Sequence, residues 1–437
     1  MSLSDSRPRA AHWAIFILLA LLLQLPLIAN PGYFSHDELQ WGARAIDGVR
    51  ADWSGVGALQ YRPLTFAIWL ALSRALFESP MLFHLAIAMF GALNATLLVA
   101  VVLRAGAAPR AALAAGVTFV LNPYAMYVHG WVATLADLTW CLCALGIAWM
   151  TLGSRRGVAP VAAVLTVAAL LAKESALSIP ALAVVGYLAD TARRRRWRGV
   201  VIATGSVSAA YLLLRHAGLS SVSDADSYAW HLRNIPARFL QFELYPLLPR
   251  VFEVHNTLVA PRLVELLVAG VVLTALVAVL ASRHWRWAVA FIAGGLAALG
   301  PVLVLDNPAT QYGYALAAWN AGVFALAWPR LRRLDRVPVL LAVALVSLHA
   351  GYVARTMLHV GRVQAVYSPA VAAAVSTSTG VVRVAPLSPG DAWMFLRLSH
   401  QIPHYRGVVL LDRIQVVPAG APADYIVAAD GSLQPAR

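Results

Sequence analysis

Charged residues are scarce in this sequence. Asp, Glu, Lys and Arg make up 12% of its 437 residues, whereas 60% are hydrophobic. A soluble domain of this length does not need so many apolar side chains for its core, so the composition excludes an ordinary soluble protein. We therefore expect an integral membrane protein.

Cysteine is nearly absent as well. The two cysteines, Cys141 and Cys143, are two positions apart within an apolar run. Side chains at that spacing point to different faces of a helix, which argues against a disulfide between them and against a metal site. We interpret both as packing residues.

Acidic residues are outnumbered, because 20 Asp and Glu stand against 34 Lys and Arg, which gives a net charge of +14. Such an excess can indicate a nucleic-acid partner, but here the arginines lie in short clusters between apolar runs. The positive-inside rule, by which Lys and Arg collect in cytoplasmic loops, explains this pattern. We expect no nucleic-acid partner.

Long apolar runs are what the sequence has in abundance. No small-residue cleavage site follows the first run, so we expect it to be retained as a span. Runs of similar length recur and predict about eleven spanning helices. They lie near 13–29, 81–103, 111–128, 133–152, 157–172, 175–190, 199–214, 259–281, 287–305, 313–328 and 337–355.

The arginine clusters predict how the chain crosses the membrane. With the N-terminus in the cytoplasm, alternate connections carry the clusters, and all of them fall on one face. They are Arg7 and Arg9, Arg104 and Arg110, Arg155 and Arg156, Arg193 to Arg196 with Arg198, Arg283 and Arg286, and Arg330, Arg332, Arg333 and Arg336. The opposite face receives most acidic residues, so we expect the chemistry outside the cytoplasm, at the plasma (inner) membrane.

Two external loops interrupt the apolar runs. Residues 31–80 form the first, and within it residues 61–77 predict a short helix at the membrane interface, since Arg62 and Arg74 flank its apolar body. Residues 215–258 form a second external segment that mixes aromatic and charged side chains, as an interfacial loop or helix does.

The composition changes again near the C-terminus. After residue 356, short β-like runs are broken by Pro and Gly. We predict an all-α transmembrane domain over 1–355 and a small extracytoplasmic α/β domain over 356–437.

His36, Asp37 and Glu38 stand side by side where the chain leaves its first apolar run. Ionisable groups at a membrane boundary are costly, so this cluster is a candidate functional site, although a solvated loop explains the pair equally well on spacing alone. Further polar groups at the outer ends of later runs favour the functional interpretation. They are Tyr61-Arg62-Pro63, Asn122-Pro123, His129, Asp137, Lys173-Glu174 and Gln311 to Tyr314.

In their order, these motifs resemble those of the GT-C class of polytopic glycosyltransferases, especially the protein O-mannosyltransferase and transmembrane O-mannosyltransferase branch. His36-Asp37-Glu38 matches the acidic pair in that branch's first external loop, and residues 61–99 match its YRPLT element, interfacial helix and second span. Residues 122–131 and 135–140 approximate two further elements, and the Leu171-Ala172-Lys173-Glu174 turn is intact.

The chain departs from this branch at several points. Leu135 and Gln311 each stand where an arginine is usual. The resemblance covers residues 13–190 well and residues 290–330 loosely, and the tetratricopeptide repeats of the branch are absent.

The resemblance implies a GT-C-like membrane fold, a sugar donor linked to polyprenyl phosphate, and transfer to an external hydroxyl. Asp37 matches the family's first acid and is expected to be the general base. A single base with direct attack inverts the anomeric carbon, so we expect inversion. Glu38 is expected to position the acceptor or to orient Asp37.

The departing lipid phosphate needs cationic or hydrogen-bonding groups that are already in place. We expect Arg62, Lys173 and Tyr312 to bind it, and because Gln311 replaces an arginine, Arg215 and Arg233 are further candidates.

Three other residues are expected to bind the acceptor or to position catalytic groups, namely His36, Asp137 and Glu174. A plainer alternative for Lys173 stays open, in which it only pairs with Glu174 or extends to the interface.

No metal site is assigned, although a divalent metal is not excluded. Asp224-x-Asp226 is the sole D-x-D pattern, and in a polar loop it more often forms a turn. The Arg- and Ala-rich composition indicates a bacterium of high genomic GC content, so we expect undecaprenyl phosphate as the carrier. The acceptor is a glycan, a lipid or a protein.

Two other functions stay open. A transporter or flippase of lipid-linked saccharides uses similar charges, but usually near the middle of the membrane, where these runs are almost free of charge. A scaffold of the cell envelope has no need of Asp37 and Lys173 together.

Overall fold

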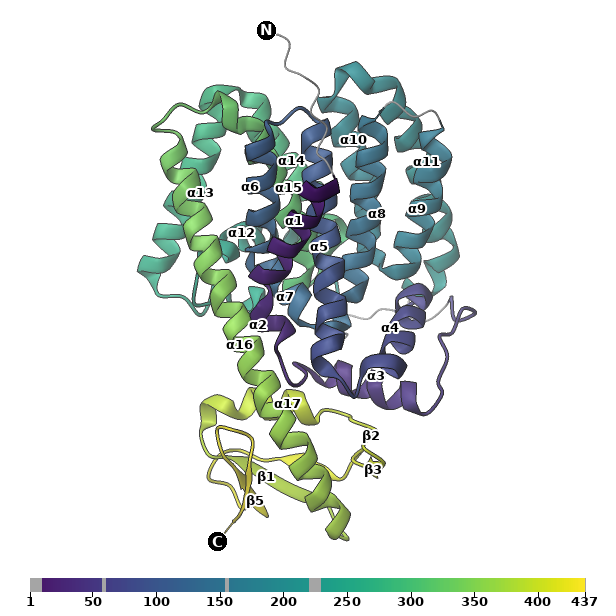
Figure 1. Cartoon of the computed structure of the whole chain (residues 1–437), viewed down its shortest axis with the longest axis vertical. Coiled ribbons are helices and arrows are strands. Elements are labelled where there is room, and N and C mark those ends of the chain that lie inside the picture. Colours follow the sequence, from purple (N-terminus) through teal and green to yellow (C-terminus); the bar gives the residue numbers. More distant parts are fainter. Residues whose placement is uncertain (1–9, 57–59, 154–156, 220–228, 437) are drawn as a thin grey trace.

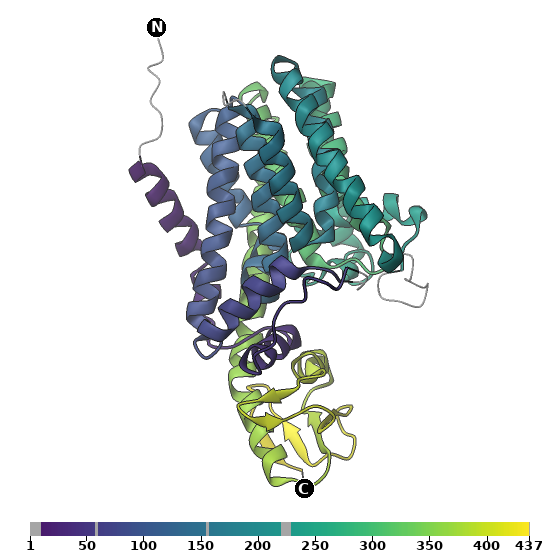
Figure 2. The same cartoon turned by 90° about the vertical axis from the view of Figure 1, so that its right-hand side faces the viewer.

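The computed structural model describes residues 10–56, 60–153, 157–219 and 229–436. A helical bundle carries a small sheet-containing unit at one end (Figures 1 and 2). The helices are α1 (Ala10–Leu23), α2 (Leu25–Ile28), α3 (His36–Ile46), α4 (Pro63–Leu76), α5 (Pro80–Arg104), α6 (Pro109–Val120), α7 (Pro123–Gly130), α8 (Leu135–Leu152), α9 (Val158–Ala172), α10 (Ser178–Ala189), α11 (Arg194–Leu219), α12 (Ile235–Leu244), α13 (Leu263–Arg283), α14 (Trp285–Leu299), α15 (Tyr314–Ala327), α16 (Arg336–Thr377) and α17 (Ala392–Ser399). The strands are β1 (Val382–Pro386), β2 (His404–Tyr405), β3 (Val408–Val409), β4 (Ile414–Val416), β5 (Tyr425–Val427) and β6 (Leu433–Pro435).

Six of the described helices are long and apolar enough to cross a membrane, namely α5, α8, α11, α13, α14 and α16. Helices α6 and α7 make a seventh span if their 56° bend is counted as a break within one crossing. Shorter apolar helices include α1, α9 and α10. The expected all-α membrane fold with a small C-terminal sheet is confirmed, whereas the count of about eleven spans stays a prediction.

Proline marks where several of these helices begin. Pro63, Pro80, Pro109 and Pro123 are the first residues of α4, α5, α6 and α7. At that position the missing N–H would have no partner within the helix, and the fixed φ of proline suits the helix. These helix starts are therefore set locally by the sequence.

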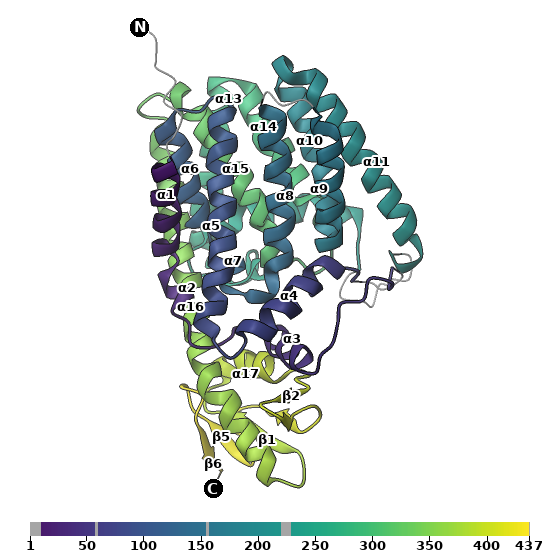
Figure 3. The same cartoon turned by 45° about the vertical axis from the view of Figure 1, so that its right-hand side comes forward.

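The loop between α2 and α5 lies across one end of the bundle. Helices α3 and α4 pass beneath the long helices, and the C-terminal unit lies on the other side of α3 (Figure 3). Helix α4 falls within residues 61–77, for which the sequence predicts a short helix. The acidic pair is thus placed between the bundle and the C-terminal unit.

Within the segment over 215–258, the first residues complete α11 and residues 235–244 form α12. Helix α11 continues past Arg215 since that side chain is buried against the first loop and not in solvent. Asp224 and Asp226 lie outside the described residues.

Helix α16 runs for 42 residues and connects the bundle to the C-terminal unit (Figure 1). The expected domain boundary at residue 356 therefore falls inside a helix. The helix continues because its buried face continues, through Val353, Val360, Val363, Tyr367 and Val371.

The C-terminal unit is built on a four-stranded sheet in the order β4-β1-β5-β6. Strand β1 pairs in parallel with β4 and β5, with Val384 opposite Val416 and Tyr425, and β5 pairs antiparallel with β6. Helix α17 packs between this sheet, α16 and α3. Helix α17 therefore places the C-terminal unit against the loop that carries the acidic pair.

Candidate active site

Glu38 is the buried member of the acidic pair, with 1% of the residue exposed. It completes a capping box with Ser35, because its Oε2 atom accepts the backbone N–H groups of Phe34 at 2.6 Å and of Ser35 at 2.8 Å. Its Oε1 atom accepts the N–H of Val132, from the turn before α8, at 2.8 Å. Burial raises the pKa of Glu38 to about 8, against the opposing effect of these three donors. Glu38 therefore ties the first loop to the bundle.

Asp37 is the accessible member of the pair, with 33% of its side chain exposed. It accepts a hydrogen bond from Ser35 Oγ at 3.3 Å and lies in the first turn of α3, where a helix favours negative charge. Trp41 and Arg44 follow it at i+4 and i+7, so the three residues share one face of α3. The structure leaves Asp37 with oxygen atoms that a substrate can approach.

His36 lies between Asp37 and the C-terminal unit. Its Nε2 atom is 3.7 Å from Asp37 Oδ1. Its ring meets the ring of His400 edge to face, with centroids 5.0 Å apart. Burial lowers the pKa of His36, partly offset by Asp37, so the neutral imidazole is favoured.

Lys173 is paired with Asp137 and not with Glu174. Its Nζ atom donates to both carboxylate oxygens of Asp137, at 2.7 and 2.5 Å, and 4% and 2% of the two side chains are exposed. The Nζ atom also lies 4.7 Å from the centre of the Tyr312 ring. The three predicted residues Lys173, Asp137 and Tyr312 therefore come together in one buried group.

Glu174 turns the other way, toward Arg62. Lys173 has extended backbone between α9 and the next 3-10 turn, so its side chain and that of Glu174 diverge. Arg62 Nε donates to Glu174 Oε2 at 2.7 Å, and 18% and 21% of these side chains are exposed. Within the described part of the chain, Glu174 Oε1 is buried and has no hydrogen-bond partner.

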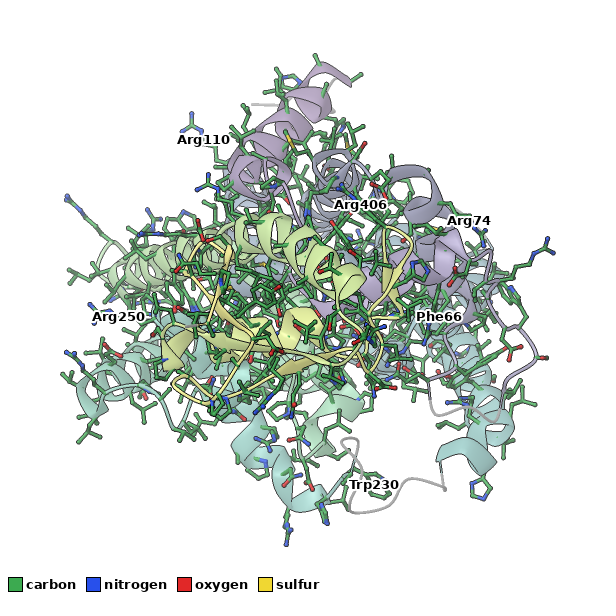
Figure 4. The ribbon with its side chains drawn as sticks, turned by 90° about the horizontal axis from the view of Figure 1, so that it is seen from below. Phe66, Arg74, Arg110, Trp230, Arg250 and Arg406 are labelled. Atoms are coloured by element: carbon green, nitrogen blue, oxygen red, sulfur yellow. The ribbon has the colours of Figure 1, made fainter. Side chains whose placement is uncertain are left out.

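A cavity of about 280 Å³ opens beside Arg62, between the loop and helices α3 and α4. Trp41 and Phe66 stack in its wall, with ring centres 4.4 Å apart. Viewed from below, Phe66 and Arg74 lie on the same side of the molecule as Arg406 of the C-terminal unit (Figure 4). The lining residues are Trp41, Arg44, Val49, Arg50, Ala51, Asp52, Gly55, Gln60, Tyr61, Arg62 and Phe66.

The start of α8 connects the two groups of predicted residues. Val132 binds Glu38, and five positions later Asp137 binds Lys173. The turn at Val132–Thr134 and the first turn of α8 therefore hold both the loop that bears Asp37 and the buried lysine.

The two further arginine candidates lie in different places. Arg215 is buried, donates to the backbone carbonyl of Val56, and places its guanidinium 5.6 Å from the centre of the Tyr61 ring, beside the cavity. Arg233 is exposed on the turn Leu232–Asn234. The structure thus brings Arg215, and not Arg233, close to the Arg62 side of the cavity.

Several residues of this region were not predicted. Arg44 and Arg50 add two guanidinium groups to the cavity, and Trp41 forms part of its wall. The i+4 and i+7 spacing from Asp37 was the available signal for Trp41 and Arg44. Arg50 follows α3 in a loop, where spacing along a helix gives no information.

No group of three His, Cys, Asp or Glu side chains suited to a metal ion occurs among the described residues. The D-x-D pattern at Asp224 and Asp226 lies outside them.

Comparison with known proteins finds a structural relative. No protein-family model and no curated protein matches the chain. Among solved structures, the chain is similar to the crystal structure of ArnT from Cupriavidus metallidurans bound to undecaprenyl phosphate, with a TM-score of 0.55 and 14% identity, over 94% of this chain and 86% of that one.

A second solved structure, the cryo-EM structure of the arabinofuranosyltransferase AftD from Mycobacteria, has a TM-score of 0.41 and 14% identity, over 94% of this chain and 31% of that one. At 14% identity the first likeness shows the fold alone, and the O-mannosyltransferase branch is not confirmed. The chain therefore has a fold similar to that of ArnT.

Proposed function

We propose that this protein is a membrane glycosyltransferase that transfers a sugar from a polyprenyl-phosphate donor to a hydroxyl of an extracytoplasmic acceptor. The contrast within the acidic pair carries this proposal. Glu38 is buried and fixes the loop, whereas the neighbouring Asp37 stays accessible at the end of a bundle with the fold of ArnT.

In the proposed reaction Asp37 is the general base. As the acceptor oxygen attacks the anomeric carbon, its proton passes to the Asp37 carboxylate. The bond from that carbon to the phosphate oxygen breaks, and the lipid phosphate departs with the electron pair. One direct displacement inverts the anomeric centre, and it needs no second carboxylate as a nucleophile.

We place the donor phosphate near Arg62 and the cavity beside it. Arg62, Arg44 and Arg50 give this cavity three guanidinium groups that suit the growing charge of the leaving phosphate. Arg62 pairs with Glu174, the chain neighbour of Lys173, and Lys173 lies against the Tyr312 ring in the buried group.

The carrier and the orientation belong to the same proposal. The ArnT structure holds undecaprenyl phosphate, which supports that lipid as the carrier. The N-terminal end of α1 and the arginine-rich connections before α11 and α16 lie at the end of the bundle opposite α3 (Figure 1). We propose that this end is cytoplasmic and that the acidic pair and the C-terminal unit face the periplasm.

The test compares Asp37→Asn with Asp47→Asn, a substitution at the C-terminal end of the same helix. Glycans and carrier lipids are analysed by mass spectrometry in cells that lack the gene and carry each variant. Asp37→Asn should lose the product and lower the turnover of the purified protein by roughly 10²- to 10⁴-fold. Asp47→Asn should keep both.

The same comparison separates the proposal from its rivals. A transporter or a scaffold should tolerate Asp37→Asn, because neither needs a base. If Asp37→Asn forms product as fast as the wild-type protein, the proposed function is wrong.

A further inference from the structure

Arg397 of the C-terminal unit enters the end of the bundle. It belongs to α17, yet its Nη1 atom donates to Glu253 Oε1 at 2.8 Å and its Nη2 atom donates to the Tyr127 hydroxyl at 3.4 Å. Only 18% of its side chain is exposed. Arg397 therefore joins three parts of the chain that are far apart in sequence.

The same guanidinium stacks on Phe34 and Trp131, two aromatic residues next to the backbone N–H groups that Glu38 accepts. Its central carbon lies 4.2 Å from the ring centre of Phe34 and 5.3 Å from that of Trp131. Phe34 itself donates its N–H to Glu38, and Trp131 directly precedes Val132, which donates the other N–H. Arg397 thus holds together both segments that Glu38 connects.

Helix α17 also contacts α3 on either side of Asp37. The ring of His400 meets that of His36, and Gln40 Nε2 donates to the backbone carbonyl of His400 at 3.0 Å. Asp37 lies between these two contacts along the chain. The first turns of α3 are therefore attached to the bundle through Glu38 and to the C-terminal unit through α17.

We propose that Arg397 is a positioning residue for the base, and that the C-terminal unit is a working part of the active site. The inference rests on the proposed role of Asp37. By stacking on Phe34 and Trp131 while paired with Glu253, Arg397 fixes the angle at which α3 presents the Asp37 carboxylate. Small displacements of a catalytic group lower the rate of reaction more than the binding of substrate.

The test is Arg397→Lys, which keeps the charge opposite Glu253 but loses the planar group that stacks on the rings. The matched control is Arg413→Lys, since Arg413 donates to backbone carbonyls of Gly380, Val375 and Ser378 within the C-terminal unit. Arg397→Lys should lower kcat by roughly tenfold or more with little change in the KM for the donor. Arg413→Lys should keep the wild-type kcat.

Hydrogen–deuterium exchange of the amides of Phe34, Ser35 and Val132 gives a readout that needs no substrate. These amides should exchange faster in Arg397→Lys and at the wild-type rate in Arg413→Lys. Glu253→Gln, which weakens the ion pair but leaves the stack, should give a smaller effect of the same kind. It keeps the test decisive if Arg397→Lys fails to fold.

Unchanged amide exchange or unchanged kcat in the Arg397 and Glu253 variants would overturn the inference, as would an equal loss in Arg413→Lys. A failure of the proposed function is seen separately, in the activity of Asp37→Asn. The exchange measurement still decides whether Arg397 holds the loop in that case.

Discussion

Asp37 and Glu38 are neighbours in the chain with opposite surroundings. An acidic pair at a membrane boundary is visible in the sequence, and so is the Ser35-x-x-Glu38 spacing of a capping box. The third bond of Glu38, to Val132, joins residues 94 positions apart and depends on the packing of α3 beneath the bundle. That bond gives Glu38 a structural role, and the proposed role of general base therefore falls to Asp37.

The pH dependence of stability should report on Glu38. Its pKa in the folded protein, about 8, lies above the ordinary value of 4.5, so the folded state holds this proton to higher pH than the unfolded state does. The stabilisation from this group is complete below about pH 4.5 and is lost as the pH rises toward about 8.

We expect the melting temperature of the wild-type protein to fall between pH 5 and pH 8 more steeply than that of Glu38→Gln, which cannot titrate. Glu78→Gln changes an exposed carboxylate that pairs with Arg406 and should keep the wild-type slope. Equal slopes for the wild-type protein and Glu38→Gln would contradict this account.

The buried Lys173–Asp137 pair leads to a second prediction, which concerns the stability of the protein. Lys173 is the single lysine of the sequence, and both partners are buried. Removing one charge leaves the other buried and unpaired, so Lys173→Met should lower the free energy of unfolding by roughly 3–5 kcal/mol. Asp137→Leu combined with Lys173→Met should recover most of that loss in a thermal melt.

The double variant also distinguishes the two interpretations of Lys173. If the lysine assists the departing phosphate, the double variant should be stable and inactive. A stable double variant with normal turnover would leave Lys173 with a purely structural role.

At the scale of the element, α16 fixes the start of the first loop. Asn30 Nδ2 donates to the carbonyl of Met357, and the N–H of Tyr33 donates to Gln364 Oε1 at 2.8 Å. Gly361 lies between them, and a Cβ atom there would collide with the side-chain amide of Asn30. This close approach explains why a glycine occurs within a long helix.

We therefore expect substitution by alanine to have opposite effects on stability at two glycines of α16. Gly361→Ala should destabilise the protein by about 1–3 kcal/mol through overpacking. Gly351→Ala, on the same helix, adds a Cβ atom with nothing within 4 Å and should be neutral or stabilising by up to about 1 kcal/mol. Thermal melts of both variants test this, and similar effects of the two would show that Asn30 can move aside.

At the scale of the whole molecule, the two ends of the bundle differ. One end carries α3, α4 and the C-terminal unit, and the other carries the connections before α11 and α16 (Figures 1 and 3). The fold establishes this polarity of the molecule. The assignment of the first end to the periplasm is a prediction from the positions of the arginines.

Cysteine labelling of intact cells tests that orientation. Leu387 is 69% exposed in the C-terminal unit, and Leu334 is 82% exposed just before α16, at the opposite end. A membrane-impermeant maleimide should label Leu387→Cys in intact cells and Leu334→Cys only after lysis. The wild-type protein, whose Cys141 is buried and Cys143 partly buried, is the background control. The reverse pattern would place the acidic pair in the cytoplasm.

The sequence by itself determined the membrane class, the short helix within residues 61–77 and the presence of a small C-terminal sheet. These features depend on composition, on hydrophobic periodicity and on residues close together in the chain. They require no knowledge of which helices are neighbours.

Only the tertiary structure decided how the charged groups pair. In the structure, Lys173 pairs with Asp137 across 36 positions, Arg62 with Glu174 across 112, and Arg397 with Glu253 across 144. A buried charge needs a partner, but many residues of opposite sign satisfy that need. Which of them does so depends on the packing of whole helices, and local spacing carries no information about that packing.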